Sequence, residues 1–250
     1  MISELMYLPL IFFSIAFFYS MAGFGGGSSY LAVLVLFPLS FEEIRFIALV
    51  CNIIVVSSSL IIFYQNRLLN LKKTLPLILL SIPLAFFGGR LQINEFTFFL
   101  GLGILLFIAS LLMWFSPSQT TNKKNSQPSF IMNSTLGGGI GFLSGMVGIG
   151  GGIFLSPILH LGRWDKAKVI AASCSFFILA NSSAGLIGQS INLNFTIPIQ
   201  LIMILGVSVF IGSQLGSRLS SKRFNSIWIR KITAILILIV AIRILIETLV

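Results

Sequence analysis

The chain has 250 residues, of which 56% are hydrophobic and 9% are charged, and its mean hydropathy is +1.04. Soluble domains carry about 25% charged residues, so this composition excludes a soluble globular protein and predicts an all-α polytopic membrane protein. The net charge is +10, but the basic residues lie between apolar runs, where such residues orient helices at a lipid surface. We therefore expect the lipid bilayer, and no nucleic acid, as their partner.

Ten apolar segments follow one another along the chain. They cover residues 5–22, 28–37, 46–63, 74–92, 96–115, 130–147, 153–161, 168–188, 195–217 and 229–249. A spanning helix needs about 20 residues, so segments 28–37 and 153–161 are too short to cross a membrane alone. The polar stretch 116–129 separates five segments from five. It predicts a first transmembrane repeat at 1–115, a linker at 116–129 and a second repeat at 130–250.

Each short segment follows a glycine cluster. The clusters read GFGGG at Gly23–Gly27 and GIGGG at Gly148–Gly152, 125 residues apart. Other features recur in the same order: Met21 and Met146 precede the clusters, Asn52 and Asn181 fall in corresponding segments about one turn out of register, and Gly88-Gly89-Arg90-Leu91 is answered by Gly216-Ser217-Arg218-Leu219. Recurring small residues also pack membrane helices, but the shared order favours an internal repeat.

The basic residues predict how the repeats are oriented. Of the 16 Lys and Arg residues, 13 lie in 64–73, the linker, 161–168 and 218–231, which the positive-inside rule places in the cytoplasm. Both termini then lie on the outer side of the cell membrane. Each glycine-tipped segment must cross an even number of times, either as a re-entrant hairpin or broken helix or as two tilted crossings. Three spanning helices follow in each half, so the second half is predicted to be inverted relative to the first.

The two glycine turns are predicted to meet near the midplane of the membrane. The helices that follow them would direct free N–H groups at this point, and helix N-termini bind anions. The predicted substrate-binding residues are Gly25, Gly26, Gly27, Ser28, Asn52, Gly150, Gly151, Gly152, Asn181 and Ser182. The alternative for each polar side chain is helix packing. We expect no cofactor and no metal, because one histidine and two separated cysteines supply no ligand set.

Four further residues have two interpretations each. Cys51 and Cys174 occur early in corresponding segments, where they contact a sulfur-containing substrate or only pack in the core. His160, the sole histidine, serves interfacial packing or proton transfer. Arg90 is an interfacial anchor or part of an outer anion vestibule.

The stretch GMVGIGGGIFLSPILHLGRWDKAKVIAASCS at 145–175 resembles the TauE/SafE family of sulfite exporters, also called the four-toluene-sulfonate uptake family. The glycine run, Pro157 and the helix that opens with small and polar residues carry the resemblance, which extends over nearly the whole chain. The first repeat matches more loosely, with Ala32 in place of Pro157. The resemblance implies transport of sulfite, thiosulfate, an organosulfonate or a related small anion.

Two other classes of function compete with a transporter of small anions. An intramembrane enzyme lacks support, because no predicted span contains a plausible set of acids, bases or metal ligands. A membrane scaffold or assembly factor without transport activity needs only the apolar bulk, but has no need of paired glycine turns. All six acidic residues fall in loops or near span ends, so we expect export by uniport driven by the membrane potential rather than a buried proton relay.

Overall fold

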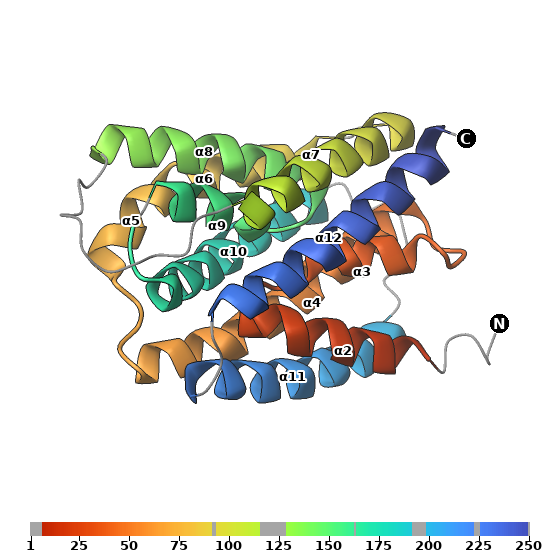
Figure 1. Ribbon diagram of the computed structural model, residues 1–250. Coiled ribbons are helices and arrows are strands. Elements are labelled where there is room, and N and C mark those ends of the chain that lie inside the picture. Colours follow the sequence, from red (N-terminus) through yellow and green to blue (C-terminus); the bar gives the residue numbers. More distant parts are fainter. Residues whose placement is uncertain are drawn as a thin grey trace.

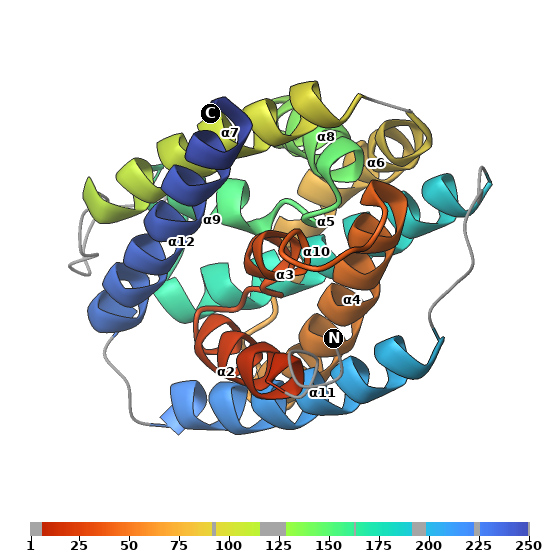
Figure 2. The ribbon, with the colours of Figure 1, turned by 90° about the vertical axis from the view of Figure 1, so that its right-hand side faces the viewer.

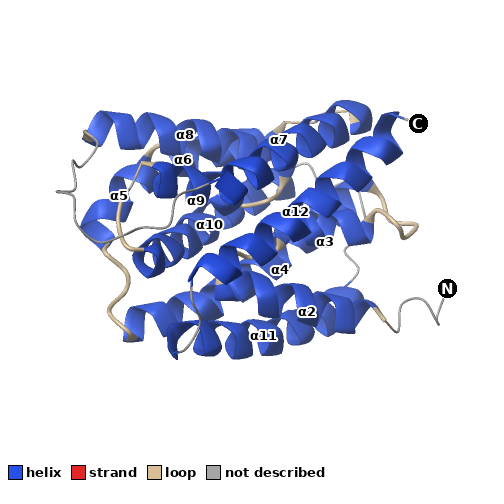
Figure 3. Cartoon of the chain, viewed as in Figure 1, coloured by secondary structure: helices blue, strands red, loops and turns tan. Residues whose placement is uncertain are grey.

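The computed structural model describes residues 7–91, 94–115, 129–162, 164–191, 199–222 and 226–249. All regular elements in these ranges are helices (Figures 1 and 3). They are α2 (Leu8–Met21), α3 (Gly27–Leu34), α4 (Phe41–Gln65), α5 (Leu71–Leu79), α6 (Ser81–Arg90), α7 (Glu95–Phe115), α8 (Phe130–Val147), α9 (Gly152–Leu161), α10 (Ala167–Ser190), α11 (Ile199–Lys222) and α12 (Ser226–Leu249). The prediction of an all-α polytopic membrane protein is confirmed.

Five described segments are long and apolar enough to cross a membrane. They are Phe41–Gln65, Leu71–Arg90, Phe130–Val147, Ala167–Ser190 and Ile199–Leu219. Large apolar side chains remain exposed on the outer helices, including Phe107 on α7, Met203 and Val207 on α11, and Ile239 on α12. Side chains of this kind suit contact with lipid tails, as expected of a multi-pass membrane protein.

Local sequence chemistry explains two differences from the predicted segments. Helix α4 begins at Phe41, five residues before the apolar segment, because Ser40 and Glu43 form a capping box in which Ser40 Oγ accepts from the Glu43 N–H and Glu43 accepts from the Ser40 N–H. The segment 74–92 is divided at Leu80 into α5 and α6. Pro83 lies three residues after Leu80, and its ring and missing N–H are incompatible with a straight helix there.

The glycine clusters connect two helical hairpins that open toward opposite ends of the molecule. In Figure 1, α2 starts and α3 ends toward the right, whereas α8 starts and α9 ends toward the left. Each hairpin has a long first arm and a short second arm: α2 has 14 residues and α3 has 8, while α8 has 18 and α9 has 10. At 1.5 Å per residue, neither short arm spans a hydrocarbon core of about 30 Å.

Helix packing interlocks the two halves. Helix α2 of the first half packs along α11 of the second, and α8 of the second half packs along α5 and α6 of the first. The backbones approach so closely that a Cβ on Gly216 would overlap the Phe17 carbonyl, and one on Gly145 would overlap the Ala85 carbonyl. Helices α4 and α10 pack on each other, as do α7 and α12. Each of these pairings has a counterpart among them when the halves are exchanged.

An end-on view shows which helices lie at the centre of this arrangement. In Figure 2, α3 lies near the middle of the molecule, with α2, α11, α12, α7, α8 and α6 around it. The aromatic, aliphatic and hydroxyl side chains of α3, α4 and α10 are largely buried. The glycine turns thus lead into the best-buried part of the fold.

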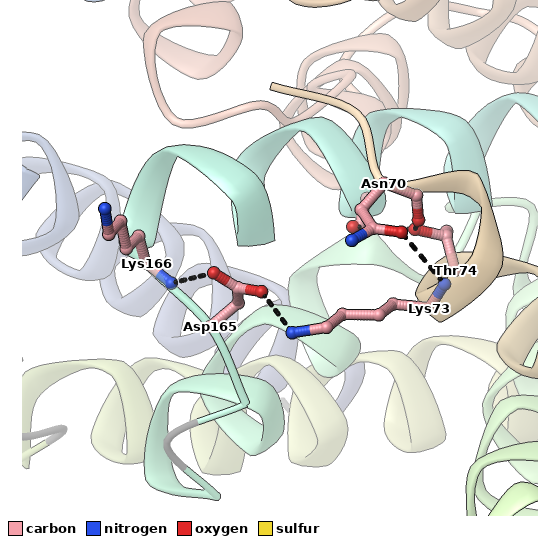
Figure 4. A network of polar contacts seen from close by, with 6 residues as sticks. Asn70, Lys73, Thr74, Asp165 and Lys166 are labelled. Atoms are coloured by element: carbon pink, nitrogen blue, oxygen red, sulfur yellow. Dashed lines mark hydrogen bonds and ion pairs between the residues drawn. The ribbon is translucent and has the colours of Figure 1, made fainter. Parts of the chain in front are cut away.

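An ion pair fastens α5 to the segment before α10 (Figure 4). Lys73 Nζ lies 2.7 Å from Asp165 Oδ2, and both side chains are largely buried. Asn70 caps α5 by accepting from the Lys73 N–H, and the Thr74 hydroxyl donates to the Asn70 carbonyl. Asp165 Oδ1 also accepts from the Lys166 N–H. A lysine of the first half is thereby fixed to the chain that follows the second hairpin.

Candidate functional site

Both glycine turns use backbone conformations that favour glycine. Gly23 and Gly26 have φ of 80° and 93°, and Gly148, Gly150 and Gly151 have φ of 81°, 79° and 80°. Gly26 is the N-cap of α3 and Gly151 is the N-cap of α9. All residues of the two clusters are buried. Because the left-handed conformation is strained for other residues, these glycines determine how the chain reverses and where α3 and α9 begin.

Asn52 of α4 joins the two turns. Its Nδ2 donates a 2.8 Å hydrogen bond to the Ile149 carbonyl of the second turn. Its amide also lies against the first turn, where a Cβ on Gly25 would overlap Asn52 Oδ1 and one on Gly27 would overlap Nδ2. A Cβ on Gly150 would lie 3.3 Å from the same Nδ2. The structure therefore brings Asn52, Gly25, Gly27 and Gly150 together.

Helix α10 makes the corresponding contacts from the other half. The Ser175 hydroxyl donates a 2.9 Å hydrogen bond to the Gly23 carbonyl, and Ser182 Oγ would lie 2.5 Å from a Cβ on Gly150. Ile178 occupies the place on α10 that Asn52 has on α4, because it packs against Gly150 and Gly152. Asn181 is one turn from that place, and its Nδ2 donates to the Phe177 carbonyl of its own helix.

Gly26 and Gly151 face away from Asn52. A Cβ on Gly26 would lie 2.9 Å from Tyr30 Cζ and from Ile15 Cγ2, and one on Gly151 would lie 3.0 Å from Ile140, Phe177 and Ser144. These two glycines shape the turns and admit close neighbours. Ser28 lies fully buried in the first turn of α3.

Four predicted site residues carry buried polar atoms without a hydrogen-bond partner among the described residues. These atoms are Ser28 Oγ, Asn52 Oδ1, Asn181 Oδ1 and Ser182 Oγ, and all four residues have 0% exposure. Tyr30 of α3 has the same property at its hydroxyl. Most buried polar atoms in proteins are paired. These side chains therefore retain hydrogen-bonding capacity beside the two turns.

Arg45 is a site residue that the sequence did not single out. It is only 3% exposed, and its Nη2 donates a 3.2 Å hydrogen bond to the Gly145 carbonyl just before the second turn. Its aliphatic stem packs beside Gly148, with a would-be Cβ 3.5 Å from Arg45 Cβ. The i, i+7 spacing to Asn52 on one helix face is the signal that would have linked the two residues.

The remaining candidate residues from the sequence are His160, Arg90, Cys51 and Cys174. His160 Nδ1 bonds the Ser156 carbonyl at 2.9 Å, and Arg90 is exposed at the end of α6. Cys51 and Cys174 are free thiols buried in the core. No group of three or more His, Cys, Asp or Glu side chains that could hold a metal ion occurs in the described part of the chain.

Comparison with known proteins decides the family. The model of the family described as sulfite exporter TauE/SafE matches residues 8–244. The chain belongs to the TauE/SafE family. One relative, named a probable membrane transporter protein of Sinorhizobium fredii, is 28% identical over 97% of this chain and 99% of its own length. Another of the same description, from Methanocaldococcus jannaschii, is 27% identical over 87% of this chain and 88% of its own.

No solved structure matches the chain. As a TauE/SafE member with several apolar helices, it is a multi-pass membrane transporter protein.

Proposed function

We propose that this protein carries a small sulfur-containing anion, such as sulfite, thiosulfate or an organosulfonate, through a site between the two glycine turns. One observation carries the proposal. The Asn52 amide contacts both turns, by its hydrogen bond to Ile149 and its packing against Gly25 and Gly27, so the N-termini of α3 and α9 begin beside the same buried side chain. Free N–H groups and the helix dipole both favour an anion there.

The position of Arg45 agrees with an anionic substrate. It places a guanidinium on the same face of α4 as Asn52, two helical turns away, next to the start of the second turn. A buried cation raises the local potential and attracts anions along the route to Asn52. In the predicted orientation, α4 starts at the outer face, so Arg45 lies between Asn52 and the outside.

Charge placement favours the membrane potential as the driving force. Glu42 and Glu43 lie in the first turn of α4, and Asp165 lies in the segment before α10, so these described carboxylates are at helix ends. With the cytoplasm negative by 100 mV, outward movement of one negative charge is favourable by about 2.3 kcal/mol, or about fifty-fold at equilibrium. Uniport would therefore produce export without a coupling ion.

The turns are buried in this conformation, so transport requires that they open to one face at a time. The oppositely directed hairpins offer a mechanism in which each hairpin and its packed partner helix moves relative to the α4–α10 pair. The halves would then exchange roles between the outward-open and inward-open states.

Flux measurements in proteoliposomes test the proposal. Sulfite, thiosulfate, sulfate and ethanesulfonate are supplied one at a time, with a potassium diffusion potential of either sign, and empty liposomes as the control. We expect flux of at least one sulfur-containing anion to reverse with the sign of the potential. Flux that ignores the potential but needs a proton gradient contradicts uniport. Absence of flux for every anion contradicts the transport proposal and favours a scaffold.

A further inference from the structure

We infer that the anion bound between the turns also donates a hydrogen bond to the protein. The substrate class is thereby narrowed to protonated oxyanions, such as hydrogen sulfite, and to sulfonates that carry a hydroxyl or amino group. This inference rests on the proposed function, because it concerns the same site.

The orientation of the Asn52 amide is determined by chemistry. Only the NH₂ end can bond the Ile149 carbonyl 2.8 Å away, since two carbonyl oxygens do not form a hydrogen bond. The Asn52 oxygen is therefore directed to the first turn, where it lies against Gly25 at the beginning of α3. It has no hydrogen-bond partner among the described residues.

Asn181 has the same arrangement. Its NH₂ end is used by the Phe177 carbonyl at 2.9 Å, so its unpartnered atom is again the acceptor Oδ1. In both side-chain amides, the NH₂ group therefore donates to a backbone carbonyl, and the oxygen is left as an unpaired acceptor. The adjacent residue, Ser182, has a hydroxyl beside Gly150 that can donate or accept.

These groups define what a ligand must offer. The N–H groups at the starts of α3 and α9 supply donors to an oxyanion, whereas Asn52 Oδ1 requires a donor at the same place. A fully deprotonated oxyanion only accepts hydrogen bonds, so it would leave this buried acceptor unpaired and repel it. An anion with one O–H or N–H group can satisfy both requirements, and an unmade buried hydrogen bond changes affinity by about tenfold or more.

The decisive experiment compares three sulfonates in wild-type proteoliposomes at fixed pH and potential. 2-Hydroxyethanesulfonate and 1-propanesulfonate differ by a hydroxyl in place of a methyl group, and 2-methoxyethanesulfonate keeps the oxygen as an acceptor without a donor. We expect the hydroxyl compound to show at least about tenfold higher kcat/KM than either of the others. Equal transport of all three overturns the inference while leaving the transport function intact. If no anion is carried, the proposed function itself fails.

The pH dependence of sulfite transport provides a second test, which does not depend on the size of a sulfonate. Between pH 6 and 8 the flux should follow the concentration of hydrogen sulfite, with 2-hydroxyethanesulfonate flux over the same range as the control for titration of the protein, because this sulfonate keeps its charge and its hydroxyl. Flux that follows the fully deprotonated sulfite dianion overturns the inference.

Variants of the two asparagines test which side-chain oxygen accepts the hydrogen bond from the ligand. Asn181→Leu and Asn52→Leu remove one amide each at similar volume, and the exposed Asn66→Leu at the end of α4 is the matched control. In whichever site variant is folded by size-exclusion chromatography, the preference for 2-hydroxyethanesulfonate over 1-propanesulfonate should fall toward one, whereas Asn66→Leu should keep it. A preference that remains at the wild-type value in both folded site variants overturns the assignment.

Discussion

At the scale of single residues, the glycines of the two clusters have different tasks. Gly25, Gly27 and Gly150 admit the side chains of Asn52 and Ser182, whereas Gly26 and Gly151 cap α3 and α9 in a left-handed conformation. A substitution at Gly25 or Gly27 fills the space around Asn52, one at Gly26 or Gly151 strains the turn itself, and one at Gly150, whose φ is 79°, does both. The repeated motif therefore combines space for polar side chains with control of the backbone.

Replacing either capping glycine by valine should reduce transport to background. Gly26→Val and Gly151→Val each impose a left-handed conformation that costs a non-glycine residue about 1–2 kcal/mol, and the added side chain meets atoms about 3 Å away. Flux per reconstituted protein is the measurement. Gly139→Ala is the control, because a Cβ there has open space and α8 is helical around it. Normal flux in both folded valine variants would show that the turns are not part of the site.

The residues that could be predicted were those tied to a repeated pattern. The glycine clusters recur after 125 residues, so their turns and the neighbouring Asn52 and Ser182 could be found from the sequence. Arg45 was missed because its charge placed it outside the apolar segment, although the capping box extends α4 past it. The sequence could not predict that Ile178 occupies on α10 the position that Asn52 has on α4. Asn181 identifies α10 as the corresponding helix, but it lies one turn out of register, so it does not show which side chain faces the turn.

At the scale of helices, length and composition predicted most of the elements. The break between α5 and α6 was not predicted, because Pro76 lies inside α5 without ending it, whereas Pro83 follows the break at Leu80 by three residues. The sequence shows both prolines equally. Both α5 and α6 pack against α8 and α10, and the sequence alone does not distinguish a proline that a helix accommodates from one that interrupts it.

Loss of the Lys73–Asp165 pair should destabilise the packing of α5 near the α9–α10 connection. Lys73→Met and Asp165→Asn each leave a largely buried charge without its partner, and we expect each to lower Tm in detergent by about 2–4 °C. The double variant should lose less than the sum, with a coupling of about 0.5–1 kcal/mol. Lys72→Met, at an exposed neighbour, is the control. Additive losses would show that the pair contributes no coupling.

At the scale of the whole molecule, the ends of the bundle predict the topology. Helix α4 ends and α10 starts at one end, while α10 ends at the other (Figure 1). The basic residues place the α4–α5 connection in the cytoplasm. That assignment of ends to membrane faces stays a prediction, as does the inversion of the second half across the membrane.

Thiol labelling tests this topology. In a Cys51→Ala, Cys174→Ala background that retains transport, Gln65→Cys and Ser190→Cys place single thiols at exposed positions where α4 and α10 end. An impermeant maleimide should label Ser190→Cys in intact cells, and Gln65→Cys only after permeabilisation. The reverse pattern would show that the protein has the opposite orientation in the membrane. Equal labelling of both thiols from outside would contradict the predicted number of membrane crossings between them.

The interlocked packing of the halves also dictates an order of assembly in the cell. Helix α2 ends at Met21 and its partner α11 begins at Ile199, so α2 emerges from the ribosome long before the surface that receives it exists. At a synthesis rate of about 5–20 residues per second, α2 remains in the membrane without α11 for on the order of ten seconds or more. During that interval the face of α2 that packs on α11 lacks its partner. Two separately expressed halves should therefore form a stable protein only where both are present in the same membrane.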